Sequence, residues 1–205
     1  VPAALREIPG APPASANPLD LDASESGLAL EASVGTLVHR CLELLAKNGL
    51  NSGSTAEPAA DSTVTRLAAL QPAWQRWLRS QGHSAAEAAS GAGEALAALT
   101  TTLHSPTGRW LLADHPEAGA EQAWSSSDGT ATTNHVIDRS FVADGARWII
   151  DYKTVRLSPA ALAARAEEYR PQLERYASLF AGDPLPLRLA IFFPLQGVMV
   201  ELPQR

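Results

Sequence analysis

The dipeptide Asp144-Gly145 lies between two segments that both have the residue pattern of β-strands, about Thr130 to Val142 and Arg147 to Thr154. Asp-Gly in that position is a strong signal for a two-residue β-hairpin turn. With this turn, Ala143 faces Ala146 and Val142 faces Arg147. Continuing the count along both strands places Asp138 directly opposite Asp151. Because side chains alternate along a strand, both carboxylates project from one face of the predicted sheet. A one-residue bulge in either strand would break this register.

Helical patterns precede this hairpin, and both helices and strands follow it. The predicted helices are about Ser33 to Lys47, a region from Ser62 to about Ser80, Ser84 to Leu103, one that starts at Ser158-Pro159 and one from Pro171 to about Phe180. The other predicted strands are Glu121 to Trp124, Leu187 to Phe193 and Val198 to Leu202. This order predicts one α/β domain with a central mixed sheet and extra N-terminal helices. Residues 1–27 have no period, which indicates a tail or linker before a domain of residues 28–205.

The composition limits the classes of protein. With 205 residues, 45% of them hydrophobic, the chain can bury one sizeable core. We find no apolar run near the ~20 residues of a membrane span and no signal-peptide pattern. The single cysteine, Cys41, fits a reducing compartment. The net charge of −6 argues against a free-standing DNA binder, unless bound metal or a larger partner offsets it. The missing initial Met is consistent with a segment of a longer protein.

The predicted hairpin brings two like charges together. Cross-strand Cβ atoms lie about 4.5–5.5 Å apart, and Ile137 and Ile149 make the surroundings apolar. A shared divalent cation is the simplest compensation, and a proton held by one carboxylate is another. Ordinary ion pairs with Arg139 and Lys153 on a solvated sheet face are a third interpretation. Lys153 shares the face of Asp151. In a chain with 14 Arg and two Lys, a lysine there indicates a specific role, such as stabilising charge on a phosphate.

Three further polar residues are candidates for the same site. His39 lies on the first predicted helix, away from the centre of its apolar stripe, which does not favour a core position. Glu43 follows one turn later and makes a zinc-like pair conceivable, although isolated histidines are mostly structural or exposed. Gln172 and Tyr176 share one face of a later helix, where they are candidates for contact with a phosphate or a base edge. Tyr176 also has the spacing of a core residue.

Four motifs occur in order along the chain: Gly35-Thr36-Leu37-Val38-His39, Val136-Ile137-Asp138-Arg139, Ile149-Ile150-Asp151-Tyr152-Lys153-Thr154, and Tyr169-Arg170-Pro171-Gln172-Leu173 with Tyr176. In this order they resemble the nuclease domain of the RecB/AddA group, within the PD-(D/E)XK nuclease superfamily, over about Gly35 to Phe193. The resemblance implies a restriction-endonuclease-like core, in which helices flank a central mixed β-sheet. One position departs from the pattern, because His135 stands where the family usually has Gly.

The resemblance also implies roles for individual residues. A Mg²⁺ or Mn²⁺ ion would be bound by His39, Asp138, Asp151 and the backbone carbonyl of Tyr152. The catalytic residues would be Asp138, Asp151, Lys153 and Glu121, the last of which matches a glutamate often found at the start of the strand meander. Gln172 and Tyr176 match the Gln-x-x-x-Tyr element of the family, which implies contact with DNA or support of the site.

The function implied by the resemblance is metal-dependent hydrolysis of DNA phosphodiester bonds, by the exonuclease domain of a helicase–nuclease in double-strand break resection and recombinational repair. The expected partners are DNA and helicase domains, which belong either to the parent chain or to a partner subunit. No membrane association is expected, and the expected location is the bacterial cytoplasm. The alternative is a catalytically inactive nuclease-fold scaffold that binds DNA ends or partner subunits. A serine or metallo-hydrolase of small substrates is disfavoured, because Gly-x-Ser-x-Gly and His-Glu-x-x-His are both missing. No phosphate-binding loop is found either, so ATPase activity is not expected.

Overall fold

The computed structural model describes residues 25–48, 60–127 and 132–203. Its helices are α1 (Glu25–Asn48), α2 (Ala60–Ala68), α3 (Gln71–Ser80), α4 (Ala85–His104), α5 (Pro106–Leu112), α6 (Leu162–Glu168) and α7 (Arg170–Ser178), with a 3₁₀ turn, η2 (Pro159–Ala161), before α6. Its strands are β1 (Gly119–Ser127), β2 (Thr132–Ala143), β3 (Ala146–Tyr152), β4 (Leu187–Phe193) and β5 (Val198–Leu202).

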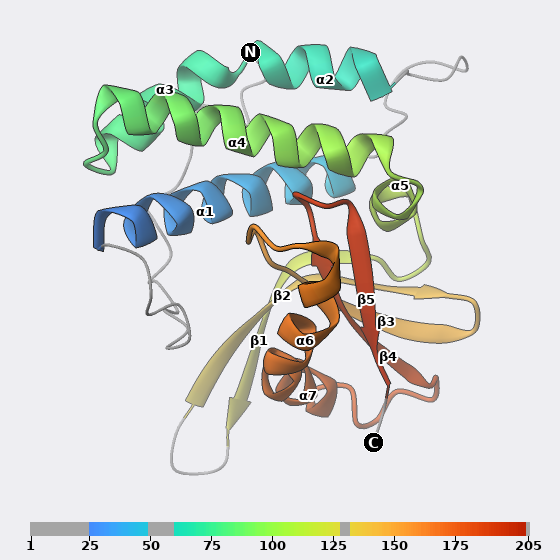
Figure 1. Ribbon diagram of the computed structural model, residues 1–205. Helices are drawn as coiled ribbons and strands as arrows, with labels where there is room; N and C mark the ends of the chain where they lie inside the picture. The colour runs from blue at the N-terminus through green and yellow to red at the C-terminus, as the bar shows by residue number, and fades with distance from the viewer. Residues whose placement is uncertain (1–24, 49–59, 128–131, 204–205) are drawn as a thin grey trace.

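The strands form one mixed sheet in the order β1-β2-β3-β4-β5. Neighbouring strands are antiparallel except for β3 and β4, which run parallel. Helices α1 to α5 form a layer on one side of the sheet, and α6 and α7 cover β3, β4 and β5 from the other side (Figure 1). The predicted mixed sheet flanked by helices, with extra N-terminal helices, is therefore confirmed. Within the described ranges, no helix combines the length and the apolar character needed to cross a bilayer.

Each face of the sheet has its own apolar core. On the side of α1 to α5, Phe141, Tyr152 and Phe192 pack with the apolar stripe of α1. On the side of α6 and α7, Ile149 and Ile191 pack with residues of those two helices. Every residue of β3 is buried, as expected for a central strand that is covered on both faces. The candidate site residues on β3, Asp151 and Tyr152, are therefore held on a well-packed strand between two layers.

The hairpin between β2 and β3 has the predicted turn. Asp144 and Gly145 both have positive φ, at 52° and 71°, which a two-residue type I′ turn requires. Val142 pairs with Arg147 and Arg139 pairs with Ile150, so the predicted register is confirmed over this stretch. The described β2–β3 pairs end at Arg139 and Ile150. Asp138 and Asp151 therefore lie one step beyond the last pair, where β2 and β3 stop pairing.

Some helix boundaries differ from the sequence-based expectation. Helix α1 begins at Glu25, inside the stretch predicted as a tail, and Leu30 still packs against the core. The helical region predicted from Ser62 to about Ser80 is divided into two helices near Pro72, where a break is expected, because this proline falls in the first turn of α3. A separate short helix, α5, follows Ser105, whose hydroxyl accepts a hydrogen bond from the Gly108 amide at 2.8 Å. Gly108 lies so close to α4 that a Cβ there would be 2.1 Å from the Thr102 carbonyl oxygen.

Candidate active site

The candidate site lies at the place where β2 and β3 stop pairing, between α1 on one side of the sheet and α7 on the other (Figure 1). Helix α1 contributes His39, β2 contributes Asp138, and β3 contributes Asp151, with Lys153 directly after it. Helix α7 contributes Gln172 and Tyr176. Apart from Glu121, whose side chain is not described, the fold brings together the side chains that the sequence analysis selected.

Asp138 connects β2 to β3 and to α1. One carboxylate oxygen, Oδ2, accepts a hydrogen bond from the backbone amide of Tyr152 at 2.7 Å. The other, Oδ1, lies 3.3 Å from Nδ1 of His39. The His39 ring also meets the Tyr152 ring edge to face, with 5.6 Å between the centroids. Because a side chain now accepts from the Tyr152 amide, Asp138 links the two strands where their backbone pairing has ended.

Asp151 is the centre of a second group of contacts. Its Oδ2 lies 2.9 Å from the Lys153 ammonium. Its Oδ1 accepts a hydrogen bond of 3.0 Å from the amide nitrogen of Gln172, which also lies 2.7 Å from the Tyr176 hydroxyl. Asp151 is 3% exposed, so these groups replace water around its carboxylate. Gln172 and Tyr176 therefore support the carboxylate from α7.

The structure arranges these groups as two pairs. His39 contacts Asp138, whereas Asp151 contacts Lys153. In the described part of the chain, no three His, Cys, Asp or Glu side chains gather into a preformed metal cage. In this arrangement each carboxylate is compensated by its own basic partner, and binding of a cation between the two carboxylates stays a prediction.

Burial and neighbouring charges shift the pKa values of the site in different directions. Burial acts to raise the pKa of Asp138, but the charge and hydrogen bond of His39, together with the Tyr152 amide and the Lys153 charge, hold this pKa below its usual value. Burial raises the pKa of Asp151, and the charge of Asp138 adds to the effect while Lys153 opposes it. Burial acts to lower the pKa values of His39 and Lys153, yet the nearby carboxylates raise both. Asp151 is thus the carboxylate that takes up a proton more readily.

Of the two ordinary ion pairs in the third interpretation, the one between Asp151 and Lys153 is formed, although the pair is largely buried and not on a solvated face. Arg139 does not contact Asp138 in the structure; its guanidinium donates to the carbonyl oxygens of Leu111, at 3.2 Å, and Ala113, at 3.0 Å. It therefore ties β2 to the end of α5. Glu43 is buried and paired with Arg40 and Lys47 on α1, so the conceivable zinc-like pair with His39 is not formed.

Glu121 is the one predicted site residue whose side chain lies outside the described part of the structure. Its backbone belongs to β1, between Ala120, which pairs with Arg139, and Gln122, which pairs with Ile137. This register places the Glu121 backbone opposite Asp138, next to the candidate site. A catalytic role for Glu121 stays a prediction.

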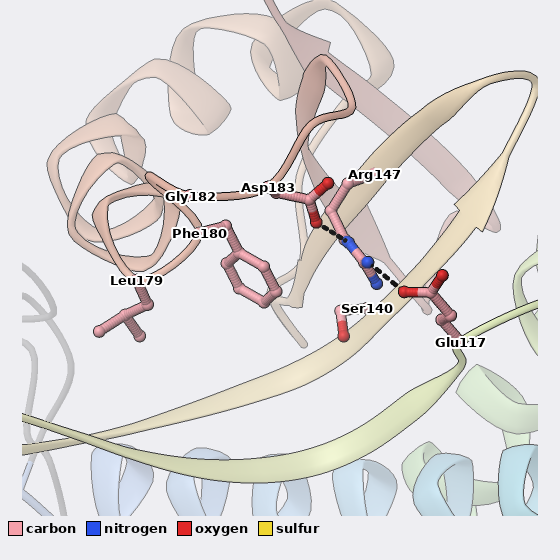
Figure 2. A pocket seen from close by; sticks show the side chains of 7 residues that line it. All are labelled: Glu117, Ser140, Arg147, Leu179, Phe180, Gly182 and Asp183. Atoms are coloured by element: carbon pink, nitrogen blue, oxygen red, sulfur yellow. Dashed lines mark hydrogen bonds and ion pairs between the residues drawn. The ribbon is translucent and has the colours of Figure 1, made fainter.

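Two features near the site had no clear signal in the sequence. The first is the aromatic ring of Tyr169, which lies against the Lys153 ammonium. The second is a pocket of about 440 Å³ on the same face of β3 as Asp151. It holds Arg147, whose guanidinium is paired with Glu117 and with Asp183 at 2.7 Å (Figure 2). These pairs join β3 to the loops before β1 and after α7, and their partners are too distant in sequence for a local pattern to predict.

The donor set of the site fits a hard divalent cation. Two buried carboxylates and an imidazole offer the oxygen and nitrogen ligands that Mg²⁺ and Mn²⁺ accept. Oδ2 of Asp151 is buried, and its partner is the Lys153 ammonium at 2.9 Å. A carboxylate oxygen already held beside a positive charge is suited to bind a cation in its place. The residues present therefore suit a metal ion, which would take the place of the Lys153 ammonium at Asp151 and would bind His39 together with the carboxylates.

Comparison with known proteins identifies one family. The sequence profile of the PD-(D/E)XK nuclease superfamily matches residues 16–201, a span that includes every residue of the candidate site. No curated protein is similar enough to count as a match. The profile match agrees with the observed mixed sheet and its flanking helices, which are consistent with a restriction-endonuclease-like fold. It does not distinguish the RecB/AddA group from other branches, and it does not bear on a link to a helicase.

Proposed function

Because the chain belongs to the PD-(D/E)XK nuclease superfamily, we propose that it hydrolyses phosphodiester bonds of DNA with the help of a divalent metal ion. The observation that carries the proposal is the contact pattern of the two carboxylates. Asp138 contacts an imidazole, and Asp151 contacts an ammonium two residues further along the chain. The segment Asp151-Tyr152-Lys153 fits the (D/E)-X-K element for which the superfamily is named.

Each residue has a distinct role in this proposal. His39, Asp138, Asp151 and the backbone carbonyl of Tyr152 would hold Mg²⁺ or Mn²⁺. When bound, such an ion lowers the pKa of a water molecule and offsets charge on the phosphate. The Lys153 ammonium would donate to a non-bridging oxygen of the scissile phosphate and stabilise the negative charge that develops there.

The remaining residues would support these groups. Gln172 donates to Asp151 and so fixes the orientation of that carboxylate. Tyr176, which lies next to the Gln172 amide, would hold Gln172 in place or contact the DNA strand. Glu121, by its register opposite Asp138, would act beside the two aspartates.

We further propose that the chain acts as the exonuclease domain of a RecB-type helicase–nuclease in double-strand break resection and recombinational repair, in the bacterial cytoplasm. The supporting observation is the net charge of −6, which disfavours strong DNA binding by this chain alone. Helicase domains of the parent chain or of a partner subunit would then supply most of the affinity for DNA. A catalytically inactive scaffold is the alternative, but the contact between Asp151 and Lys153 favours catalysis.

The test is a cleavage assay with end-labelled single-stranded and double-stranded DNA, in Mg²⁺, in Mn²⁺ and in excess EDTA. We expect cleavage that requires metal, and a loss of about 100-fold or more in Asp151→Ala and in Lys153→Ala. Matched controls are Asp61→Ala, whose side chain is 84% exposed, and Lys47→Ala, which removes the other lysine of the chain. Both controls should cleave like the wild type.

Two results would contradict the proposal. Cleavage that continues in EDTA, or in the purified Asp151→Ala protein, would show that the site is not responsible. DNA binding by the wild type without any cleavage in either metal would favour the scaffold instead.

A further inference from the structure

Tyr169 lies at the junction of α6 and α7 and turns its ring towards the candidate site. The Lys153 ammonium lies 4.7 Å from the centre of this ring. Tyr169 is 4% exposed and packs with Leu162, Ala166 and Leu173, so the ring is held by a well-packed core. A cation over an aromatic face is attracted by the negative charge on that face, and the attraction increases when water is excluded.

The same turn of the chain also positions the residue that holds Asp151. The Tyr169 carbonyl oxygen accepts a hydrogen bond from the backbone amide of Gln172 at 3.0 Å. Gln172 in turn donates to Asp151 through its side chain. The chain around this junction therefore places the side-chain amide of Gln172 against the Asp151 carboxylate and the ring of Tyr169 against the Lys153 ammonium.

We propose that Tyr169 is a positioning residue, whose ring holds the Lys153 ammonium at the scissile phosphate. The inference rests on the proposed nuclease function. In the structure, the described contacts of the ammonium are with Asp151 and Tyr169. Any cation bound by Asp151 would compete with Lys153 for the same carboxylate, whereas the ring contact would persist. A lysine side chain is long and flexible, so a fixed second contact limits the positions of its charge.

A second cation near the ring does not replace Lys153 in this role. The Arg165 guanidinium lies 5.6 Å from the Tyr169 ring centre, but it is also paired with Glu168 at 2.6 Å. The contact with Lys153 is shorter, and it involves the residue that stands next to Asp151. The proposed contact with Lys153 depends on the face of the Tyr169 ring and not on its hydroxyl group. Substitutions that change only one of the two therefore test the proposal.

The test replaces Tyr169 with phenylalanine and then with mono-, di- and trifluorinated phenylalanines, in the full chain. Each fluorine weakens the negative charge on the ring face while the shape changes little. We expect Tyr169→Phe to cleave DNA within about threefold of the wild type. Along the fluorinated series, kcat should fall stepwise, on the order of tenfold by the trifluoro ring, with KM nearly constant. The melting temperature should fall by only a few degrees, because the packing is retained and only the attraction between ring and ammonium is weakened.

Phe180 provides a matched control, because its ring faces the Arg147 guanidinium at 5.6 Å, in the pocket that Glu117 and Asp183 also line (Figure 2). Trifluorinated phenylalanine at position 180 should leave kcat unchanged. If kcat is equal for phenylalanine and trifluorophenylalanine at position 169, Tyr169 does not hold Lys153 through its ring. That failure is distinct from failure of the proposed function, in which the wild type itself would not cleave DNA in Mg²⁺ or Mn²⁺.

Discussion

Replacing Lys153 with alanine should destabilise the folded protein as well as abolish cleavage. The Asp151 side chain is 4% exposed and that of Lys153 is 20% exposed, so their ion pair is largely buried. Removing one partner of a buried ion pair costs about 3–5 kcal/mol, because the other charge stays buried without compensation. Gln172 still donates to Asp151 in the variant, and Lys153 is partly solvated. We therefore expect a cost at or somewhat below the lower end of this range, about 2–3 kcal/mol.

Two kinds of measurement give this loss. Urea unfolding without added metal gives the change in free energy. Because each kcal/mol corresponds to about 2–4 °C in a chain of this size, the melting temperature should fall by roughly 4–12 °C. The loss of unfolding free energy caused by Lys153→Ala should be smaller at lower pH. Burial already raises the pKa of Asp151, removal of the ammonium raises it further, and protonation of Asp151 then relieves the unpaired charge.

Lys47→Ala is the control for this experiment, because Lys47 also pairs with a buried carboxylate, that of Glu43. Glu43 keeps Arg40 as a second partner, and Lys47 is 52% exposed. Its removal should therefore cost less than about 1 kcal/mol. If Lys153→Ala costs no more than Lys47→Ala at neutral pH, then Asp151 does not depend on Lys153 for its charge, and the account of the site as two compensated pairs is wrong.

Two further predictions concern the fold around the site. Gly108→Ala should lower the free energy of unfolding by about 3 kcal/mol or more, because the new Cβ would lie 2.1 Å from the Thr102 carbonyl oxygen. Gly93→Ala, at a helical position with no atom within 4 Å of the new Cβ, should instead raise it by about 1 kcal/mol, and equal urea midpoints for the two variants would contradict this reasoning. The backbone amide of Leu185 and the Arg147 guanidinium hold the pKa of Asp183 below its usual value. The stabilisation by Asp183 is therefore complete above about pH 4 and is lost as the pH falls through the lowered pKa. Urea midpoints between about pH 2 and 5 should fall less steeply in Asp183→Asn than in the wild type, and parallel curves would show that these contacts do not form.

Local chemistry explains why much of the fold could be predicted from the sequence. Asp144-Gly145 fixes a two-residue turn, and the turn fixes the register of β2 and β3 near it. The apolar stripe of α1 is buried as its spacing predicts. Each of these features depends on residues that are close in the sequence, or on a periodicity that burial imposes.

The features that escaped prediction depend on contacts between distant residues. The carbonyl partners of Arg139 lie in α5 and just after it. The ring that faces Lys153 belongs to Tyr169, at the start of α7. Cation–aromatic contacts and buried guanidinium pairs have no fixed spacing along a chain. The candidate residues and the Asp151–Lys153 pair could therefore be proposed from the sequence, whereas the contact between His39 and Asp138 and the contacts of Tyr169 and Arg139 could not.

The position of the site follows from the end of strand pairing between β2 and β3. Past the last backbone pair, the Tyr152 amide still needs an acceptor, and the Asp138 carboxylate provides it. That hydrogen bond holds the Asp138 carboxylate, which is 8% exposed, near Asp151, which is 3% exposed. Burial of two carboxylates is unfavourable unless their charges are compensated. His39 from α1 and Lys153 offset the two charges. In the proposed function, a divalent cation bound with His39 would take over this compensation, and Lys153, released from Asp151, would then be free to contact a phosphate. The same burial that makes the unliganded site depend on its ion pairs would thus favour metal and phosphate binding.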